Sequence, residues 1–363
     1  MSGTVGAGVR AGAGVRAGAG AGAGAAVRAG AGADAGADAP VAGGRFAVGI
    51  DIGGTKTAAG LVDIATGAVV VRTEAPTRAA AGPDAVLATA IRLAESVIAS
   101  APSLASVVSA GVGAAGVIDP VRRVVVSATD TLPGWAGTPI GEAVEAAIGV
   151  PVVVENDVHA HAIGEARSGA GRGRGTVLLV AAGTGIGGAL IAGGALVRGA
   201  GHVAGHYGHL PSVEAHGLPC TCGRAGHVEM IAAGPAILAA YLRAGGSSVP
   251  DTRAVFALAD AGDELAAATI TLAATALGRT IGGLVNAIDP DIVVIGGGLA
   301  ATGARWWNPL RAGIDAETIP AATGLPVVAA ELGGDAAIVG AALASASTPS
   351  LVPNERSASG EPC

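Results

Sequence analysis

Short apolar runs alternate with stretches of helical periodicity over most of the chain. The runs that predict strands are rich in Val, Ile and Ala and lie at residues 46–52, 60–62, 68–72, 107–112, 152–154, 177–180, 189–192 and 292–295. Apolar positions recur at helical spacing over residues 85–99 and 264–287. Strands alternating with helices favour an α/β architecture. Because the pattern occurs twice, we expect two α/β lobes with a cleft between them.

The two ends of the chain differ from this middle part. Residues 1–44 consist almost wholly of Gly, Ala, Val, Arg and Asp, with the unit VRAGAG at 9–14, 15–20 and 27–32. Such a segment has too little apolar side-chain surface to offset the entropy lost on ordering, so we expect a disordered tail. Residues 346–363 are rich in Ser and Pro and predict a second disordered tail.

Composition narrows the class of protein. Of 363 residues, 62 are glycine, 51% are hydrophobic and 13% are charged, which excludes a charge-rich disordered chain. The apolar runs are shorter than the roughly 18 residues of a membrane span, so we expect a soluble protein without a membrane partner. The formal net charge is −7 and the basic residues form no dense cluster. We therefore expect no nucleic-acid partner.

Cysteine and lysine usage adds two observations. The three cysteines, Cys220, Cys222 and Cys363, are too few for a disulfide framework, and the first two are too close to bridge easily. A reducing cytoplasm and a metal-binding function are favoured instead. Lys56 is the only lysine in the sequence, whereas the other 20 basic residues are arginines.

A glycine turn follows the first predicted strand, with the residues Asp51, Gly53, Gly54, Thr55 and Lys56. Adjacent glycines let a hairpin turn present backbone N–H groups to a phosphate without obstruction by Cβ atoms. Asp51 can hold a hydrated Mg²⁺ ion, and Lys56 can supply positive charge. Taken alone, the same run is equally compatible with a plain β-turn.

A second glycine turn, with Gly183, Thr184 and Gly185, lies between the predicted strands 177–180 and 189–192. Neither glycine turn is followed by a helix, which disfavours a Rossmann fingerprint and a P-loop. Two hairpin turns, one in each lobe, indicate a pair of phosphate clamps.

Four motifs in this order and spacing resemble the ROK family (repressor, open reading frame, kinase) of bacterial sugar kinases. They are DIGGTKT at 51–57, ENDVHA at 155–160, AGTGIGG at 182–188 and CTCGRAGHVE at 220–229. The resemblance covers residues 45 to about 344. It implies a two-lobed, actin-like ATPase (ribonuclease H-like) sugar-kinase fold with an interlobe cleft. Residues 45–153, joined by a C-terminal helix at 334–345, would form the first lobe, and residues 154–333 the second.

The resemblance also implies a catalytic base. Asp157 directly follows the predicted strand 152–154, where Asn and Asp are also common as helix N-caps. In the family this aspartate accepts the proton of the attacking sugar hydroxyl. By the same resemblance, Asn156 binds a sugar hydroxyl and the donor is ATP with Mg²⁺. Family members are commonly homodimers.

Histidines and cysteines gather within 26 positions, and five of the seven histidines of the chain are among them. The members are His202, His206, His209, His216, Cys220, Cys222 and His227. Two cysteines with a histidine on either side match the ligands of structural zinc. The alternative is that they are small core residues and solvated loop histidines. The resemblance implies zinc at His209, Cys220 and Cys222, and His227 stands where the family has a third cysteine.

Further sugar and nucleotide contacts are implied by the resemblance. Glu229, His209 and the glycine loop beginning at Gly113 would face the sugar. Gly297 and Gly298, after the last predicted strand, would lie on the adenosine side.

The chain departs from the family at two sugar positions. His206 stands where the family has a sugar-binding Glu, and Thr131 stands where it has an Asn. A neutral imidazole accepts one hydrogen bond and donates one, unlike a carboxylate, so the hydroxyl pattern that is recognised must differ.

These motifs predict an ATP-dependent hexose kinase acting on the 6-hydroxyl of glucose or of a 2-amino or N-acetyl hexose, such as N-acetylglucosamine or N-acetylmannosamine. Two alternatives stay open. A ROK-type sugar-responsive repressor needs roughly 60 residues of winged helix-turn-helix, whereas 44 low-complexity residues precede residue 45. A sugar sensor without catalysis would explain His206 and Thr131, but the presence of Asp157 disfavours it.

Overall fold

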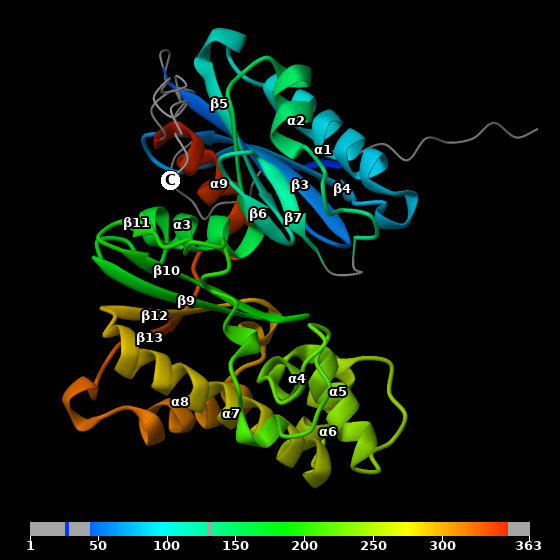
Figure 1. Ribbon diagram of the computed structural model, residues 1–363, viewed down its shortest axis with the longest axis vertical. Coiled ribbons are helices and arrows are strands. Elements are labelled where there is room, and N and C mark those ends of the chain that lie inside the picture. Colours follow the sequence, from blue (N-terminus) through cyan, green and yellow to red (C-terminus); the bar gives the residue numbers. More distant parts are fainter. Residues whose placement is uncertain (1–25, 29–43, 129–131, 348–363) are drawn as a thin grey trace, which may run out of the picture.

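The computed structural model describes residues 26–28, 44–128 and 132–347. Two main sheets lie one above the other, with helices between them and on both outer sides (Figure 1). Strands β6 (Val117–Asp119) and β7 (Val124–Ser127) form a separate pair. Short 3-10 turns connect the elements at Ala79–Ala81, Leu104–Ser106, Tyr207–His209, Val213–Ala215, Gly298–Ala301, Pro320–Ala322 and Gly333–Asp335.

The upper sheet has six strands in the order β1-β4-β3-β2-β5-β8. The strands are β1 (Ala26–Arg28), β2 (Phe46–Ile52), β3 (Lys56–Asp63), β4 (Val69–Pro76), β5 (Val107–Ala114) and β8 (Val152–Asn156). Strands β2, β5 and β8 run parallel, while β3 and β4 extend the sheet antiparallel. The parallel arrangement brings the carboxyl ends of three strands to one edge.

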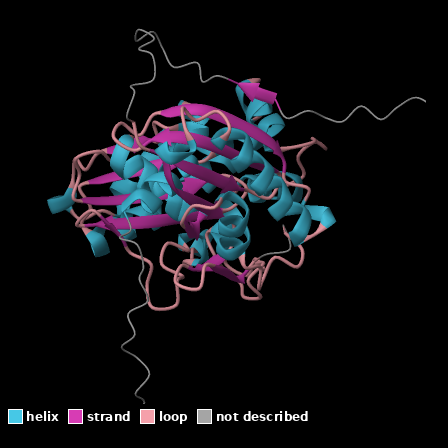
Figure 2. Cartoon of the chain, turned by 90° about the horizontal axis from the view of Figure 1, so that it is seen from above, coloured by secondary structure: helices cyan, strands magenta, loops and turns pink. Residues whose placement is uncertain are grey.

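Helices α1 (Pro83–Ile98) and α2 (Ile140–Ile148) cover the outer face of this sheet, and Figure 2, seen from above, shows helices over its strands. Helix α1 begins with a proline, which needs no hydrogen-bond acceptor in the first turn. Its apolar positions Val86, Ala90, Leu93 and Val97 recur at helical spacing and are buried. Burial of this apolar stripe against the sheet holds the helix in place.

The lower sheet has five strands in the order β11-β10-β9-β12-β13. They are β11 (Ala195–Leu196), β10 (Ile186–Ala192), β9 (Thr176–Ala182), β12 (Ile292–Gly296) and β13 (Val327–Ala329). A helical layer covers the outer face: α4 (Glu229–Ala232), α5 (Gly234–Arg243), α6 (Thr252–Asp260), α7 (Glu264–Ile288) and α8 (Ala304–Glu317). Alternate residues of β9 and β12 face this layer, and those between them face the inner layer.

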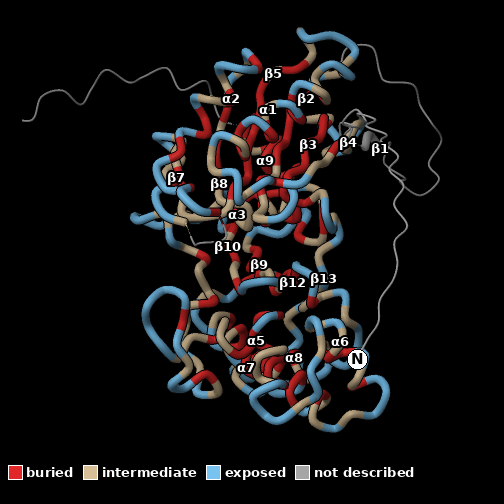
Figure 3. The backbone as a smooth tube through the Cα atoms, turned by 90° about the vertical axis from the view of Figure 1, so that its right-hand side faces the viewer, coloured by how far each residue is buried: buried red, intermediate tan, exposed pale blue. Residues whose placement is uncertain are grey.

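Helices α3 (Asp157–Ser168) and α9 (Ala336–Ser347) form the layer between the two sheets. Their backbones approach so closely that a Cβ atom at Gly340 would lie 1.7 Å from the carbonyl oxygen of Ala160. Figure 3 shows this central region as mostly buried chain. Because the base of the cleft is built from these two packed helices, small residues there are a structural requirement.

Several predicted bounds need correction. Strand β1 lies inside the predicted disordered tail, where its backbone pairs with the otherwise open edge of β4. The predicted strands 60–62 and 68–72 are longer, because the hairpin of β3 and β4 continues pairing through polar residues as far as Pro76. The last helix runs from Ala336 to Ser347 rather than from 334 to 345, since Gly333–Asp335 forms a 3-10 turn first.

Helix α7 is long and apolar enough, by length and composition, to cross a membrane. In the structure, 56% of its most apolar window is buried, and it packs against the neighbouring helices of the lower layer. This is the arrangement of a core helix. The predicted helix over residues 264–287 is confirmed and ends one residue later, at Ile288.

Candidate active site

The carboxyl ends of the parallel strands form the upper wall of the site. Asp51 on β2 is in register with Gly113 on β5, which in turn is in register with Glu155 on β8. A Cβ atom at Gly113 would lie 3.5 Å from the Cα atom of Asp157. Gly113 therefore leaves open the space between Asp51 and the first turn of α3.

The first predicted glycine turn is the hairpin between β2 and β3. The Gly53 N–H donates to the Lys56 carbonyl at 3.1 Å, and the Thr77 hydroxyl donates to the Gly53 carbonyl at 2.6 Å. These bonds fix the turn in shape. Lys56, however, forms an ion pair with Glu74 at 3.0 Å, and it is more than half exposed. Of the residues predicted from this turn, Asp51 alone lines a described cavity, and Gly54 and Thr55 lie on the turn beside it.

Two cavities meet at Gly298. The cleft cavity, about 560 Å³, lies between the sheets and is lined by Asp51 and His161 together with Gly296, Gly297, Gly298, Gly333, Gly334 and small alanines. The helical pocket, about 570 Å³, is lined by Gly183 and Thr184 of the second predicted turn, by Gly298, and by residues of α5 and α6. Gly298, predicted on the adenosine side, therefore lines both cavities, one with Asp51 and the other with Gly183 and Thr184.

Asp157 begins α3 directly after strand β8. Burial raises the pKa of its carboxyl group above the usual range. Burial, together with the negative charge of Asp157, also raises the pKa of Asp51 to about 7. A carboxylate with a raised pKa is a better proton acceptor, so the position of Asp157 suits a general base.

Asn156 is the N-cap of α3. Its Oδ1 accepts from the N–H groups of Val158 and His159, and its Nδ2 donates to the Gly116 carbonyl at 2.9 Å. The side chain that was predicted to bind sugar therefore also fixes the loop after β5 to the start of α3.

An ion pair supports the segment before the base. The carboxylate of Glu155, 7% exposed, accepts from the Nε atom of Arg198 at 3.1 Å and also from its terminal nitrogen. His159 holds the same region from the other side, because its Nε2 atom lies 2.8 Å from the Ala204 carbonyl. The two contacts join the end of β8 and the first turn of α3 to the loop that follows β11.

The second predicted glycine turn connects β9 to β10. The Gly183 N–H donates to the Gly185 carbonyl at 3.0 Å. Glu229, in the first turn of α4, accepts from the Ile186 N–H at 2.9 Å, and a Cβ atom at Gly185 would lie 2.8 Å from the same carboxylate oxygen. One oxygen of Glu229 is therefore used to hold this turn.

The predicted metal ligands come together. The ligand atoms of His209, Cys220, Cys222 and His227 all lie within 4.8 Å of one another. Their Nδ1 and Sγ atoms face in pairs, at 3.5 Å between His209 and Cys220 and at 3.3 Å between His227 and Cys222. Two thiols and two imidazoles at this spacing fit a tetrahedral zinc ion. His202 and His216 are not part of the group.

His206, one of the predicted sugar residues, lies beside this cluster. The rings of His206 and His209 stack with their centroids 6.2 Å apart. Burial lowers the pKa of His206, and His209 and Glu229 are among its charged neighbours. Trp135 is buried and donates from Nε1 to the Ala115 carbonyl, which fixes the loop after β5. Thr131 lies outside the described residues.

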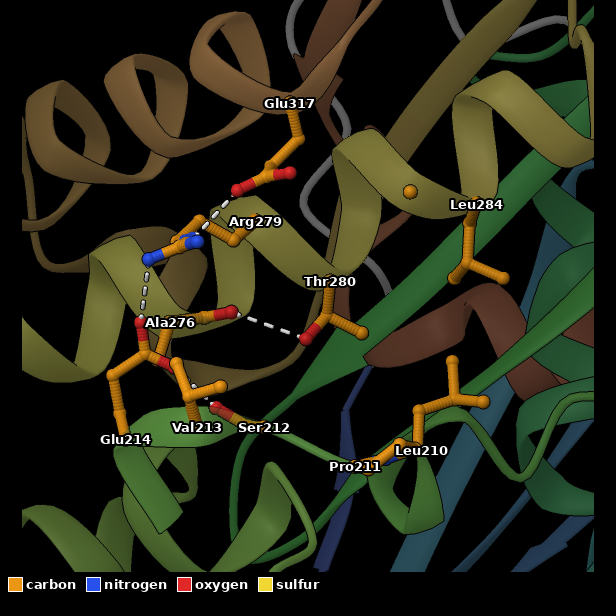
Figure 4. A pocket seen from close by; sticks show the side chains of 11 residues that line it. Leu210, Pro211, Ser212, Val213, Glu214, Ala276, Arg279, Thr280, Leu284 and Glu317 are labelled. Carbon is orange, nitrogen blue, oxygen red and sulfur yellow. Dashed lines mark hydrogen bonds and ion pairs between the residues drawn. The ribbon is translucent and has the colours of Figure 1, made fainter. Parts of the chain in front are cut away.

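A third cavity, about 400 Å³, lies away from these residues between α7 and the segment that follows His209 (Figure 4). Arg279 extends between Glu214 and Glu317, with which it forms ion pairs at 3.2 Å and 2.7 Å. Through these two ion pairs, Arg279 joins the metal-binding segment to the helical layer.

Several residues of the site carry no motif that sequence reasoning used. Asp251, Thr252, Arg253 and Phe256 line the helical pocket from α6 and its cap, far along the chain from both glycine turns. His159 and His161 had a usable signal: they are the two histidines outside residues 202–227, and both lie within four residues of Asp157.

Comparison with known proteins shows the family to which the chain belongs. The profile of the ROK family matches residues 47–347. The chain is 32% identical to a glucokinase of Halalkalibacterium halodurans, over 82% of this chain and 93% of that protein. It is 35% identical to an N-acetylmannosamine kinase of Escherichia coli, over 81% and 96% respectively. The crystal structure of a ROK family glucokinase from Streptomyces griseus in complex with glucose and AMPPNP superposes with a TM-score of 0.71 at 32% identity, covering 84% of this chain and all of that one.

Proposed function

Because the chain belongs to the ROK family, we propose that it is a sugar kinase, and more specifically an ATP-dependent hexose kinase that phosphorylates the 6-hydroxyl group. Glucose and N-acetylmannosamine are the substrates named for its relatives, and glucosamine and N-acetylglucosamine share their 6-hydroxyl. The two α/β halves, residues 45–153 with α9 and residues 154–333, would act as lobes on either side of the substrates. We further propose that the enzyme works in the cytoplasm.

One observation carries the proposal. The helical pocket and the cleft cavity share Gly298, and the cleft cavity reaches Asp51, whose pKa is raised by burial and by the charge of Asp157. A nucleotide in the helical pocket would therefore direct its phosphates toward the carboxylate that is to act as the base. Donor and base converge without any rearrangement of the strands.

The chemistry follows from these positions. The oxygen of the sugar 6-hydroxyl attacks the γ-phosphorus of ATP in line with the bond that joins it to the bridging oxygen of ADP. Asp157 accepts the hydroxyl proton as the new P–O bond forms and the bond to ADP breaks. The products are the sugar 6-phosphate and ADP, and the proton later leaves Asp157 for solvent. Backbone N–H groups of the turns at Gly53–Lys56 and Gly183–Gly185 would stabilise the charge on the phosphates.

Asp51 fits a Mg²⁺ site. Its carboxyl group lies in a cavity, where burial and then the negative charge of Asp157 raise its pKa, and a cation would offset the repulsion between the two carboxylates. When bound with ATP, Mg²⁺ supplies charge neutralisation for the transferred phosphoryl group. Asp51 would hold the hydrated ion, while Lys56 would first have to leave Glu74 to contact the phosphates.

The zinc cluster has a structural role in this proposal. It fixes the segment that carries His206 and His209 beside Glu229, and these three side chains with Asn156 would bind the sugar hydroxyls. Glu229 keeps one oxygen for substrate because the other already accepts from Ile186. His209 would serve both metal and sugar. Thr131 remains a proposed contact from the sequence alone.

The test is a coupled ADP-release assay of the full chain with Mg·ATP and five sugars: glucose, mannose, glucosamine, N-acetylglucosamine and N-acetylmannosamine. We expect turnover with at least one sugar, and phosphorus NMR should place the phosphate on the 6-hydroxyl. A product phosphorylated at the anomeric position would contradict the proposed reaction. Binding of a sugar without turnover would support a sugar sensor instead.

A further inference from the structure

The cleft cavity contains a side chain that the proposed reaction does not yet use. His161, on the second turn of α3, lines the cavity together with Asp51, and nearly all the other lining residues are glycine or alanine. The ring packs against β12, because a Cβ atom at Gly296 would lie 2.8 Å from its Cε1 atom. Only 16% of the side chain is exposed.

The Nε2 atom of His161 is buried and has no hydrogen-bond partner among the described residues. Its nearest acid is Glu165, one turn later on the same helix, but the separation of 4.0 Å is too long for a hydrogen bond. The Glu165 carboxylate already accepts from three backbone N–H groups, those of Ala170, Glu331 and Leu332. An unsatisfied buried nitrogen is costly, so a partner from a ligand is favoured.

His159 provides a comparison on the same helix. Its Nε2 atom has a partner, the Ala204 carbonyl at 2.8 Å, and it faces the loop after β11 rather than the cavity. A histidine on α3 is therefore satisfied where the fold supplies an acceptor. The open Nε2 atom of His161 is specific to the cavity side of the helix.

The surroundings of this nitrogen favour an anion held close to Asp51. Ala337 in the first turn of the twelve-residue helix α9, and Gly333 and Gly334 in the 3-10 turn before it, line the same cavity, and a helix N-terminus attracts negative charge. The cavity also joins the helical pocket at Gly298, the proposed entrance for the nucleotide. Among the described residues, Asp51, the proposed Mg²⁺ residue, is the only acid that lines it. Such a chamber matches the phosphate chain of a magnesium nucleotide.

We propose that His161 binds the phosphate chain of the nucleotide donor, with its Nε2–H group donating a hydrogen bond to a β- or γ-phosphate oxygen. This inference rests on the proposed kinase function. It assigns His161 a binding role that adds to those of the two glycine turns. The phosphate oxygen would supply the partner that Nε2 lacks in the free protein.

Calorimetric titration of the full chain with Mg·AMPPNP and with AMP tests the proposal, using the variants His161→Ala and His161→Gln. We expect His161→Ala to weaken Mg·AMPPNP binding about 10-fold or more, as for a lost hydrogen bond to a charged group, and to leave AMP binding unchanged. His161→Gln keeps an N–H donor at similar reach and should restore most of the affinity. His159→Ala is the matched control and should bind Mg·AMPPNP like the wild type.

The outcomes separate this inference from the function on which it rests. If the wild type turns over a hexose but His161→Ala keeps full affinity for Mg·AMPPNP, the inference is wrong and the kinase assignment stands. If His161→Ala loses affinity for AMP and for Mg·AMPPNP equally, His161 has a packing role and the inference is also wrong. If the wild type binds no Mg·AMPPNP, both are wrong. Thermal melts of each variant establish that the compared proteins are folded.

Discussion

Asp51 and Asp157 lie at the same sheet edge, and the pKa of Asp51 is raised to about 7 by its burial and by the negative charge of Asp157. Gly113 makes this proximity possible, since it contributes no side chain to the space between them. Without a bound cation, two neighbouring carboxylates destabilise the charged form of the site. The arrangement costs stability in the free protein, and in the proposed function a magnesium nucleotide would offset this cost.

We expect Asp51→Asn to stabilise the free protein in a pH-dependent way. The folded-state pKa lies above the unfolded value of 3.8, so the folded protein binds the proton more tightly. The stabilising contribution of Asp51 is therefore present at low pH and is lost as pH rises from about 4 to 7. Because Asp51→Asn has no carboxyl group to ionise, its free energy of unfolding does not fall in this way. The difference amounts to about 4 kcal/mol at most, from a shift of roughly three pKa units.

Urea unfolding at pH 5 and pH 8, without nucleotide or Mg²⁺, measures this effect. The advantage of Asp51→Asn over the wild type should be larger at pH 8. Asp315→Asn, at an exposed position of α8, is the control and should show no such trend. An advantage that is equal at both pH values would mean that Asp51 has an ordinary pKa in the folded protein.

Gly340→Ala should destabilise the protein strongly. The new Cβ atom would lie 1.7 Å from the Ala160 carbonyl oxygen, so α3 and α9 would have to separate. Overpacking of this kind costs about 3 kcal/mol or more when backbone must move. Gly283→Ala on α7 is the control, because nothing lies within 4 Å of its added Cβ atom. That variant should gain up to about 1 kcal/mol from helix propensity. Chemical unfolding of both variants decides whether the contact between α3 and α9 is as tight as described.

Metal removal should release about one zinc ion per chain and lower the melting temperature. The reason is that the metal would hold together a segment with few other buried side chains. Its ligands would be His209, Cys220, Cys222 and His227. Cys222→Ser should reduce the zinc content, whereas Cys363→Ser, at a cysteine outside the cluster, should retain it. Mass spectrometry for metals on freshly purified protein provides the readout. Freshly purified wild-type protein without zinc would show that the cluster does not bind this metal.

His206→Glu should change which hexose is preferred. A carboxylate accepts two hydrogen bonds where a neutral imidazole accepts one and donates one, so the hydroxyl pattern that fits best must change. Mispaired polar groups in a buried site cost at least about 10-fold in kcat/KM. Measured kcat/KM ratios among the five sugars should shift by that amount. Unchanged ratios would mean that His206 does not contact the sugar.

Much of the fold could be predicted from the sequence because its signals are local. The buried strands β2, β9 and β12 are short Val- and Ile-rich runs, and α7 shows clear periodicity. Motif spacing also predicted the metal cluster, since its four ligands lie within 19 residues of one another and need only one loop to meet.

Other parts depend on contacts that no local pattern records. The helical pocket combines Gly183 with Thr252 and Phe256, which only the packing of α5 and α6 brings together. The pairing of Lys56 with Glu74 depends on the register of β3 and β4. For His161, the sequence reveals the histidine near Asp157, but only the structure shows that its side chain lines a cavity and that its buried Nε2 atom has no partner among the described residues.

The most direct test of the central claim is single-turnover phosphoryl transfer by Asp157→Asn, with ATP and the best sugar both saturating. The account predicts a loss of at least about 100-fold in the rate of transfer, the contribution of general base catalysis, with an unchanged sugar dissociation constant and melting curve. A transfer rate close to that of the wild type would contradict the assignment of Asp157 as the base.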